Sequence, residues 1–364
     1  MKLAVYGSSL LSAYWNGAAT YYRGILGALA ARGVEIVFYE PDALDRQKHR
    51  DIDPPDWCRV VVYPATREGV AAAAAEAAAA DVAVKTSGVG HADDALLAQV
   101  FAAARDDALK VWWDVDAPAT LAEIEAAENH PLRAALPQID LVLTYGGGDV
   151  VRRRYRELGA KACEAVYNAL DPATHHPVPP EPRFICDLGL LANRLPDREA
   201  RIDEFFFAAA AEQPAGRFLL GGSGWDDKAA PPGVIKLGHV GTADHNAFNC
   251  SARAVLNVTR DSMAAVGYSP PTRLFEAAGA GACVITDAWR GIEMFLTPGH
   301  EVLVARDAAD VVDALGDLTP ERAREIGSAA LDRVRAEHTY DRRAAALAET
   351  LTAALAAKRG DRAA

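Results

Sequence analysis

The chain has 364 residues, of which 51% are hydrophobic and 24% are charged, a composition that suits a globular protein of two domains. Its net charge of −12 disfavours nucleic acids and anionic membranes as partners, because both bind basic surfaces. The sequence has no apolar run of the roughly 18 residues that span a bilayer and no signal-peptide pattern at its start, so we expect a cytoplasmic protein without a membrane span.

Strand-like apolar runs alternate with helix-like stretches through the first half of the chain. The predicted strands are residues 3–6, 35–39, 59–63, 82–84, 111–113 and 141–144. The helical stretches between them include the alanine-rich residues 70–80. This alternation predicts βαβ units, in which helices cover both faces of a parallel sheet.

A proline-rich segment, DPATHHPVPPEP at residues 171–182, interrupts this alternation with five prolines. We expect it to be a hinge between a first domain, residues 1–170, and a second, residues 183–338. In the second domain the strands are predicted at residues 184–186, 218–220, 235–237, 255–258, 284–286 and 302–305. Residues 339–364 are predicted to end the chain as a helix. The expected fold class is α/β, with two doubly wound Rossmann-like domains facing a cleft.

Several familiar catalytic signatures are missing from the sequence. It has no Walker A loop, no HExxH and no GxSxG, and the run that starts at Gly88 is a poor match to a dinucleotide fingerprint. The five cysteines are far apart and odd in number, which disfavours a disulfide framework or a CxxC metal site and favours free thiols in a reducing compartment. The sequence therefore disfavours a hydrolase, a P-loop protein and a simple dehydrogenase.

The stretch from 257 to 287 combines groups that suit a nucleoside diphosphate. Pro271 is predicted to start a helix, whose first-turn amides form an anion site. Arg260 and Arg273 add positive charge for a diphosphate. Glu276, one turn further on, is suited to accept both hydroxyls of a ribose. The alternative is an ordinary capped helix with solvated side chains.

The same stretch resembles a known family. Its run RLFEAAGAG at 273–281, followed by TD at 286–287 and GIE at 291–293, is similar to the donor-site signature of the group 1 glycosyltransferases, which have the GT-B fold. The similarity is greatest to the CgeB-like branch, named after a spore maturation protein, and YNALD at 167–171 and GLLANRLPDR at 189–198 agree with it. HTY at 338–340 resembles the start of the last helix, which in this fold crosses back to the first domain.

The resemblance implies roles for individual residues of the second domain. Glu276 matches the glutamate that holds the donor ribose, and Thr272, Arg273 and Arg260 match positions that contact the donor phosphates. Many members have a second glutamate eight positions before the first, in contact with the donor sugar, but this chain has Tyr268 there. In this fold the arginines and helix amides neutralise the leaving diphosphate, so we expect no metal and no cofactor.

Three residues of the first domain are candidates for catalysis. Asp114 and Asp116 follow a predicted strand and are suited to line a cleft and to position or deprotonate an acceptor hydroxyl. An equally weighted alternative makes Asp116 the N-cap of the next helix. His91 also follows a strand and titrates near neutral pH, although a histidine near a turn is more often structural.

Further candidates for donor binding lie in loops that follow strands. The long loop after the first strand has small residues, which let a ligand approach the backbone, and aromatic ones suited to a lid. Such loops can equally be plain turns. The candidates are Gly7, Ser8, Asn16, Gly17, Arg194, Ser223 and His239.

The sequence thus predicts a hexosyltransferase-like enzyme. It would move a sugar from a nucleotide-diphosphate donor, such as a UDP-sugar, to an acceptor hydroxyl or similar nucleophile on a small molecule, glycan or protein. Transfer without a metal and with retention is expected from the family. The alternatives are a sugar-nucleotide epimerase or hydrolase of the same fold and a non-catalytic spore or surface-assembly protein that keeps it.

Overall fold

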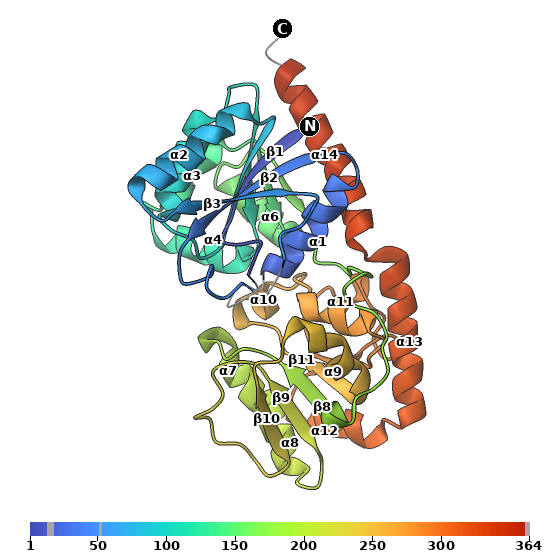
Figure 1. The fold of residues 1–364 in the computed structure, drawn as a ribbon. Helices are drawn as coiled ribbons and strands as arrows, with labels where there is room; N and C mark the ends of the chain where they lie inside the picture. Colours follow the sequence, from blue (N-terminus) through green and yellow to red (C-terminus); the bar gives the residue numbers. More distant parts are fainter. Residues whose placement is uncertain (13–17, 51–52, 361–364) are drawn as a thin grey trace. The chain divides into compact units, whose positions relative to one another are not determined.

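The computed structural model of the protein describes residues 1–12, 18–50 and 53–360 (Figure 1). These residues form two compact units. The first unit comprises Met1–Tyr167 together with the segment that begins at Tyr340, and the second unit is Asn168–Thr339. Each unit is built around one parallel sheet with helices on its faces (Figure 1), which confirms the predicted α/β class with two doubly wound, Rossmann-like parts.

The first unit has a seven-stranded sheet in the order β3-β2-β1-β4-β5-β6-β7, and every pair of neighbouring strands is parallel. The strands are β1 (Lys2–Tyr6), β2 (Glu35–Asp42), β3 (Arg59–Pro64), β4 (Val82–Thr86), β5 (Leu109–Asp114), β6 (Leu141–Thr144) and β7 (Cys163–Ala165). The helices are α1 (Ala18–Ala30), α2 (Arg67–Ala75), α3 (Asp93–Ala103), α4 (Ala117–Ala126), α5 (Pro131–Ala135), α6 (Gly148–Glu157) and α14 (Tyr340–Gly360), with 3₁₀ turns at Glu76–Ala79 and Leu136–Gln138.

The second unit has a six-stranded sheet in the order β10-β9-β8-β11-β12-β13, again with parallel neighbours. The strands are β8 (Cys186–Leu191), β9 (Phe218–Gly221), β10 (Val234–Gly238), β11 (Ala252–Asn257), β12 (Val284–Asp287) and β13 (Leu303–Ala305). The helices are α7 (Pro196–Ile202), a π-helical turn (Asp203–Phe207), α8 (Ala208–Glu212), α9 (His245–Ser251), α10 (Asp261–Val266), α11 (Thr272–Gly279), α12 (Ala308–Asp317) and α13 (Pro320–Glu337), with 3₁₀ turns at Pro182–Phe184, Thr242–Asp244 and Ile292–Met294.

Strand positions follow the apolar runs because helices cover both faces of a parallel sheet, so its central strands are hydrophobic on both sides. All of β4 is buried, as are four of the five residues of β1. One expected strand, at 184–186, is misplaced. Pro182 fixes its own φ angle and opens a 3₁₀ turn, and the strand begins only at Cys186.

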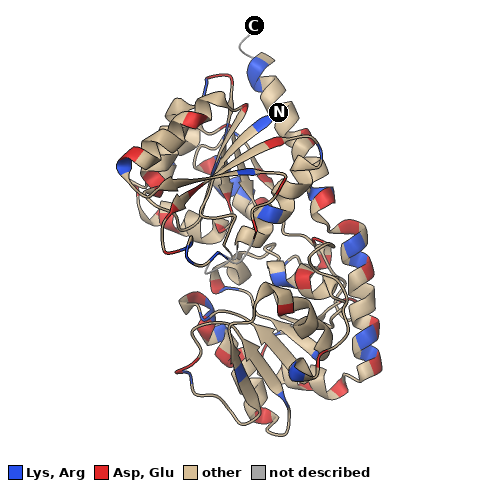
Figure 2. Cartoon of the chain, in the orientation of Figure 1, with Lys and Arg blue, Asp and Glu red and all other residues tan. Residues whose placement is uncertain are grey.

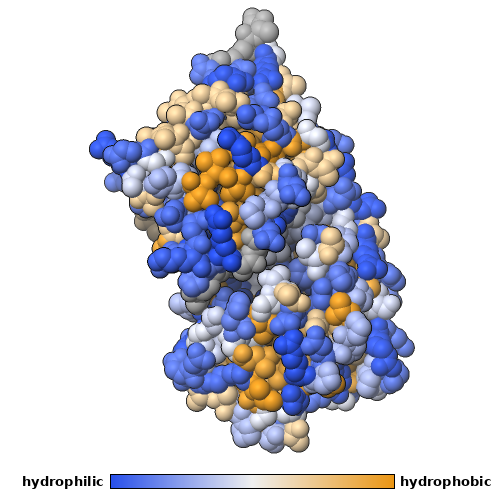
Figure 3. Space-filling model, in the orientation of Figure 1, coloured by the Kyte–Doolittle hydropathy of each residue, from blue (hydrophilic) through white to orange (hydrophobic). Residues whose placement is uncertain are grey.

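Surface composition follows position in the fold. Over β3, an edge strand of the first sheet, Figure 3 shows hydrophobic residues at the surface, and Val60, Val61 and Val62 of this strand are half-buried. Along α13, basic and acidic residues alternate (Figure 2), and they form ion pairs such as Arg333–Glu337. Among the helices that the structure describes, none combines the length and apolar character that crossing a membrane requires.

The chain divides after Tyr167 and after Thr339, whereas the sequence places the boundary in the proline-rich segment. Residues 171–182 belong to the second unit, because they are hydrogen-bonded to α9. The Val178 amide contacts the Cys250 sulfur at 3.4 Å, and the Glu181 amide donates to the Ser251 hydroxyl at 2.7 Å. A hinge role for this segment stays a prediction.

Helix α14 belongs to the first unit and packs on α1. Gly24 of α1 faces the ring of Tyr340, and the Arg32 guanidinium donates to the Asp341 carboxylate at 2.8 Å. A Cβ atom on Gly24 would overlap the Tyr340 ring, so the absence of a side chain lets the two helices approach closely.

We therefore expect Gly24→Ala to destabilise the first unit by about 1–3 kcal/mol through overpacking. Gly316→Ala is the matched control, because Gly316 lies in α12 and a Cβ there meets no atom within 4 Å. That change should stabilise α12 by roughly 0.5–1 kcal/mol. Urea unfolding measures both free energies, and equal stability of Gly24→Ala and the parent protein would contradict the packing described.

Candidate functional site

Strand order in each sheet reverses at one point. In the first sheet it reverses between β1 and β4, and in the second between β8 and β11. Ligands of doubly wound sheets bind beyond the carboxyl ends of the strands at such points. In the second unit the loops there lead from β8 to α7 and from β11 to α10. The chain then enters α11, where the sequence predicts a diphosphate site.

Helix α11 begins one residue later than predicted. Pro271 is its N-cap, with extended backbone angles, and Thr272 is its first residue. The carbonyl of the preceding Pro270 accepts a hydrogen bond from the Asn168 side chain at 2.9 Å, which fixes the entry of the chain into the helix. Pro271 has no side-chain group to cap α11, and of the amides at positions 272–274 only that of Leu274 donates to a described residue, at the Pro271 carbonyl 3.1 Å away.

Arginines gather at this helix start. Arg273 lies in the first turn and is partly buried, and its guanidinium forms no hydrogen bond or ion pair with any residue that the structure describes. Burial lowers its pKa, although Glu276 acts in the opposite sense. Burial and the nearby charge of Arg273 also lower the pKa of Arg198 to about 10, and Arg260 adds to this repulsion.

Only part of this positive charge is neutralised within the unit. Arg260, the N-cap of α10, forms an ion pair with Asp197. Arg198 donates one hydrogen bond to the Asn193 carbonyl at 2.8 Å, while its buried Nε finds no partner in the described part of the chain. Arg198 is the last residue of the run GLLANRLPDR, and no local pattern marks it as a phosphate contact.

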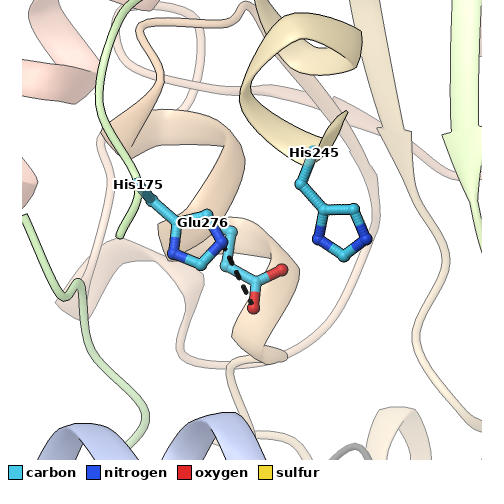
Figure 4. A group of neighbouring side chains, drawn as sticks. All are labelled: His175, His245 and Glu276. Carbon is cyan, nitrogen blue, oxygen red and sulfur yellow. Dashed lines mark ion pairs between the residues drawn. The ribbon is translucent and has the colours of Figure 1, made fainter. Parts of the chain in front are cut away.

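Glu276 lies one turn after Thr272 on α11. Its carboxylate has two histidines as neighbours (Figure 4). His175 comes from the proline-rich segment, with its Nε2 atom 4.0 Å from Glu276 Oε1, and His245 is the first residue of α9. No sequence signal indicated these histidines, because they lie far from Glu276 along the chain.

Other predicted donor contacts have different surroundings. Arg194 is paired with Glu199 at 2.7 Å and Asp227 at 2.9 Å, and these hydrogen bonds raise its pKa. The Ser223 amide donates to the Asn193 side chain, and His239 is exposed after β10. Within the described residues, no hydrogen bond, ion pair or ring contact joins Ser223 or His239 to α11. Of the predicted donor contacts, Arg260, Thr272, Arg273 and Glu276 therefore lie at or near the start of α11. Arg194 instead links Glu199 and Asp227 through its ion pairs.

Tyr268 stands where the family pattern has a second glutamate. Its φ angle is +51°, in the left-handed region, and the Arg290 guanidinium lies 5.4 Å from the ring centre. A Cβ on Gly291 would overlap this ring, so the loop after β12 closes tightly on it. The position therefore presents an aromatic face in place of a carboxylate.

The sequence places Asp114 in the lining of a cleft, but the structure buries it completely at the end of β5. It accepts hydrogen bonds from the Asp116 amide at 2.9 Å, from the Thr120 hydroxyl at 3.1 Å and from the Tyr155 hydroxyl. Burial raises its pKa. Since the Asp116 and Thr120 donors belong to the start of α4, the carboxylate holds this end of the helix in place.

The two remaining catalytic candidates occupy less enclosed positions. Asp116 is the N-cap residue of α4, although its side chain does not cap the helix amides. His91 is half-buried in the turn between β4 and α3. The neighbouring Lys85 is almost wholly buried, and its ammonium group pairs with Asp93 at 2.6 Å. Catalytic roles for Asp116 and His91 stay predictions.

The loop after β1 is fixed by a residue that the sequence did not reveal. Glu40 of β2 is completely buried and accepts hydrogen bonds from the Leu10 amide at 2.6 Å and the Gln47 side chain at 2.7 Å. Gly7 is required by packing, because a Cβ there would lie 2.5 Å from the Phe38 ring, and Ser8 is buried. The predicted donor contacts Asn16 and Gly17 lie outside the described residues.

Comparison with known proteins agrees with this arrangement. Residues 198–349 match a family model described as "Glycosyl transferase-like". This matched region includes Arg260, Arg273 and Glu276. No curated protein sequence matches the chain.

Solved structures share the fold over almost the whole chain. Sucrose-phosphate synthase from Thermosynechococcus elongatus is 16% identical with a TM-score of 0.71, over 98% of this chain and 100% of that one. Anabaena HepE, solved with UDP and glucose, is 14% identical with a TM-score of 0.67, over 97% and 100%. An alpha-glucosyltransferase solved with UDP-glucose and DNA is 10% identical with a TM-score of 0.70, over 97% and 99%. At this identity the likeness shows the GT-B fold alone.

The surroundings of Asp114 generate a test of its role. We expect Asp114→Asn to destabilise the protein by about 1–3 kcal/mol, because the amide cannot accept from all three donors. Asp116→Asn exchanges one favoured N-cap residue for another and should change stability by less than about 0.5 kcal/mol. Thermal unfolding measures both, and an unchanged stability of Asp114→Asn would show that the carboxylate is not structural.

Proposed function

We propose that the protein is a glycosyltransferase that moves a sugar from a nucleoside-diphosphate donor to an acceptor hydroxyl or similar nucleophile. The observation that carries this proposal is Arg273, a partly buried guanidinium with no protein partner among the described residues, at a helix start that no side chain caps. Charge and amides there are oriented for an anion, and Glu276 lies one turn away.

The two ends of this site suit the two parts of the donor. Arg273, Arg198 and the first-turn amides of α11 would bind the diphosphate and stabilise the charge that grows on it as the sugar leaves. Glu276, which accepts hydrogen bonds only, would accept one from each of the two ribose hydroxyls. The structures solved with UDP or UDP-glucose on the same fold support uridine as the base.

Finer features of the proposal come from the sequence resemblance. Retention is expected because it is usual in the family. Transfer is expected to need no metal, because the arginines would neutralise the diphosphate. The runs YNALD and GLLANRLPDR favour the CgeB-like branch, and the composition favours the cytoplasm. The donor sugar faces Tyr268 in place of a glutamate, so its recognition should differ from that in most of the family.

Nucleotide binding tests the role of Glu276. UDP should raise the melting temperature, since a ligand at 100 times its dissociation constant stabilises by about 2.7 kcal/mol. Glu276→Gln removes a charged acceptor and should weaken UDP binding by roughly 10- to 100-fold. Glu325→Gln, on exposed α13, is the control and should bind normally. Unchanged UDP affinity in Glu276→Gln would refute the ribose site.

A crossed comparison of UDP with uridine separates the phosphate end of the site from the ribose end. Arg273→Gln should weaken UDP binding by roughly 10- to 100-fold and leave uridine binding unchanged, because only the diphosphate needs the charge. Glu276→Gln should weaken both ligands. Arg324→Gln, an exposed arginine of the same unit, serves as the control. Isothermal titration gives these affinities, and equal losses for both ligands in Arg273→Gln would contradict the assignment.

Activity separates transfer from the other reactions of the fold. UDP released from UDP-sugars only when an acceptor is added indicates a transferase, whereas product from the donor alone indicates an epimerase or hydrolase. If the folded protein binds no nucleotide, the remaining candidate is the non-catalytic spore or surface-assembly protein.

A further inference from the structure

Three side chains from distant parts of the sequence converge beside α11. His175, His245 and Glu276 each offer one ligand atom, and these atoms all lie within 4.8 Å of one another (Figure 4). The His175 and Glu276 side chains are 4% and 14% exposed. The chemistry of this cluster depends on which nitrogen of each ring carries the proton.

The protonation of His245 follows from its neighbour. Its Nε2 atom lies 3.3 Å from the Val240 carbonyl oxygen. A carbonyl only accepts hydrogen bonds, so Nε2 must carry the proton and the lone pair belongs to Nδ1. In Figure 4 the other ring nitrogen is directed toward Glu276.

His175 is oriented in a similar way. The Thr174 hydroxyl donates its one proton to the Asp171 carbonyl at 3.2 Å, so it can only accept from the His175 Nδ1 atom, which is 3.1 Å away. The lone pair of His175 is therefore on Nε2, the atom that lies 4.0 Å from Glu276 Oε1.

The cluster thus brings together three electron-pair donors without a proton between them. The carboxylate of Glu276 alone has enough lone pairs for both hydroxyls of a ribose. Two imidazole lone pairs are left over, and neutral imidazole with carboxylate is the ligand set of zinc and neighbouring transition metals. Each ring also donates its other N–H to an oxygen, as metal-bound histidines do.

We infer that His175 Nε2, His245 Nδ1 and the Glu276 carboxylate form a binding site for a divalent transition metal such as Zn²⁺. Tetrahedral ligands about 2.0–2.1 Å from zinc lie roughly 3.4 Å apart, so the side chains draw together slightly on binding. Mg²⁺ and Ca²⁺ prefer oxygen ligands and bind weakly here. A metal on Glu276 displaces the ribose, so zinc inhibits nucleotide binding; this consequence rests on the proposed function.

Metal binding is measured directly on the full chain without a histidine tag. Equilibrium dialysis with Zn²⁺ should give one ion per chain, and Co²⁺ should give the visible absorption of a tetrahedral site. His175→Gln, His245→Gln and Glu276→Gln should each lose at least about tenfold in affinity. His176→Gln is the matched control, because His176 is adjacent in sequence but outside the cluster. Its affinity should equal that of the parent.

The outcomes of the dialysis are distinct. Equal zinc affinity in the parent and in His245→Gln, with circular dichroism showing both folded, would overturn the site. The same loss in His176→Gln as in His175→Gln would show adventitious binding to surface histidines and would also overturn it. His175 is buried, so if His175→Gln unfolds, His245→Gln and the Co²⁺ spectrum decide.

Competition with nucleotide is a separate measurement. Zn²⁺ should weaken UDP binding at least about tenfold in the parent, EDTA should restore it, and Mg²⁺ should have no effect. In His245→Gln, zinc should leave UDP binding unchanged, which also controls for zinc bound by free UDP. If the protein binds zinc but not UDP, the proposed function is refuted and the metal site is supported. If it binds UDP but has no zinc site, the metal site is refuted and the proposed function is supported. Undiminished UDP binding at saturating zinc would overturn the competition.

Discussion

The site depends on a guanidinium that the protein leaves unsatisfied. Arg273 is partly buried in the first turn of α11, where the helix dipole already disfavours a cation, and Arg198 and Arg260 lie near enough to raise the cost further. None of the described residues forms a hydrogen bond or an ion pair with the Arg273 guanidinium. Such an arrangement lowers the stability of the protein without a ligand, and a bound anion would offset that cost. Functional sites are where proteins commonly depart from the pairing of buried charges seen in the rest of a fold.

Several other basic side chains of the second unit are neutralised by carboxylates. Arg201 pairs with the buried Asp287 at 2.6 Å, Arg194 pairs with two acidic residues, and Lys228 reaches Glu199 and Asp203. These pairs hold loops and strand ends in place. Arg273 differs from these residues, because among the described residues no carboxylate or carbonyl accepts a hydrogen bond from its guanidinium.

The sequence predicted what depends on local pattern. Apolar runs located most strands because buried parallel strands are hydrophobic on both faces, and the spacing from Pro271 to Glu276 placed a carboxylate one turn inside a helix. It did not predict contacts between distant segments. By sequence alone His175 belongs to a proline-rich linker, and no motif marks His245. Asp114 shows a different limit, since a strand-end carboxylate looks the same in sequence whether it faces a ligand or a buried tyrosine hydroxyl.

The site has two ends of opposite character, and this narrows what it can bind. At the start of α11 lie the Arg273 guanidinium and the first-turn amides, which donate hydrogen bonds, whereas Glu276, one turn further on, offers a carboxylate, which only accepts them. One helical turn of about 5.4 Å separates them. A simple anion would satisfy only the first end and a metal ion only the second. A molecule that joins an anionic diphosphate to a sugar with two adjacent hydroxyls would satisfy both ends, which supports the proposal that the ligand is a nucleoside diphosphate.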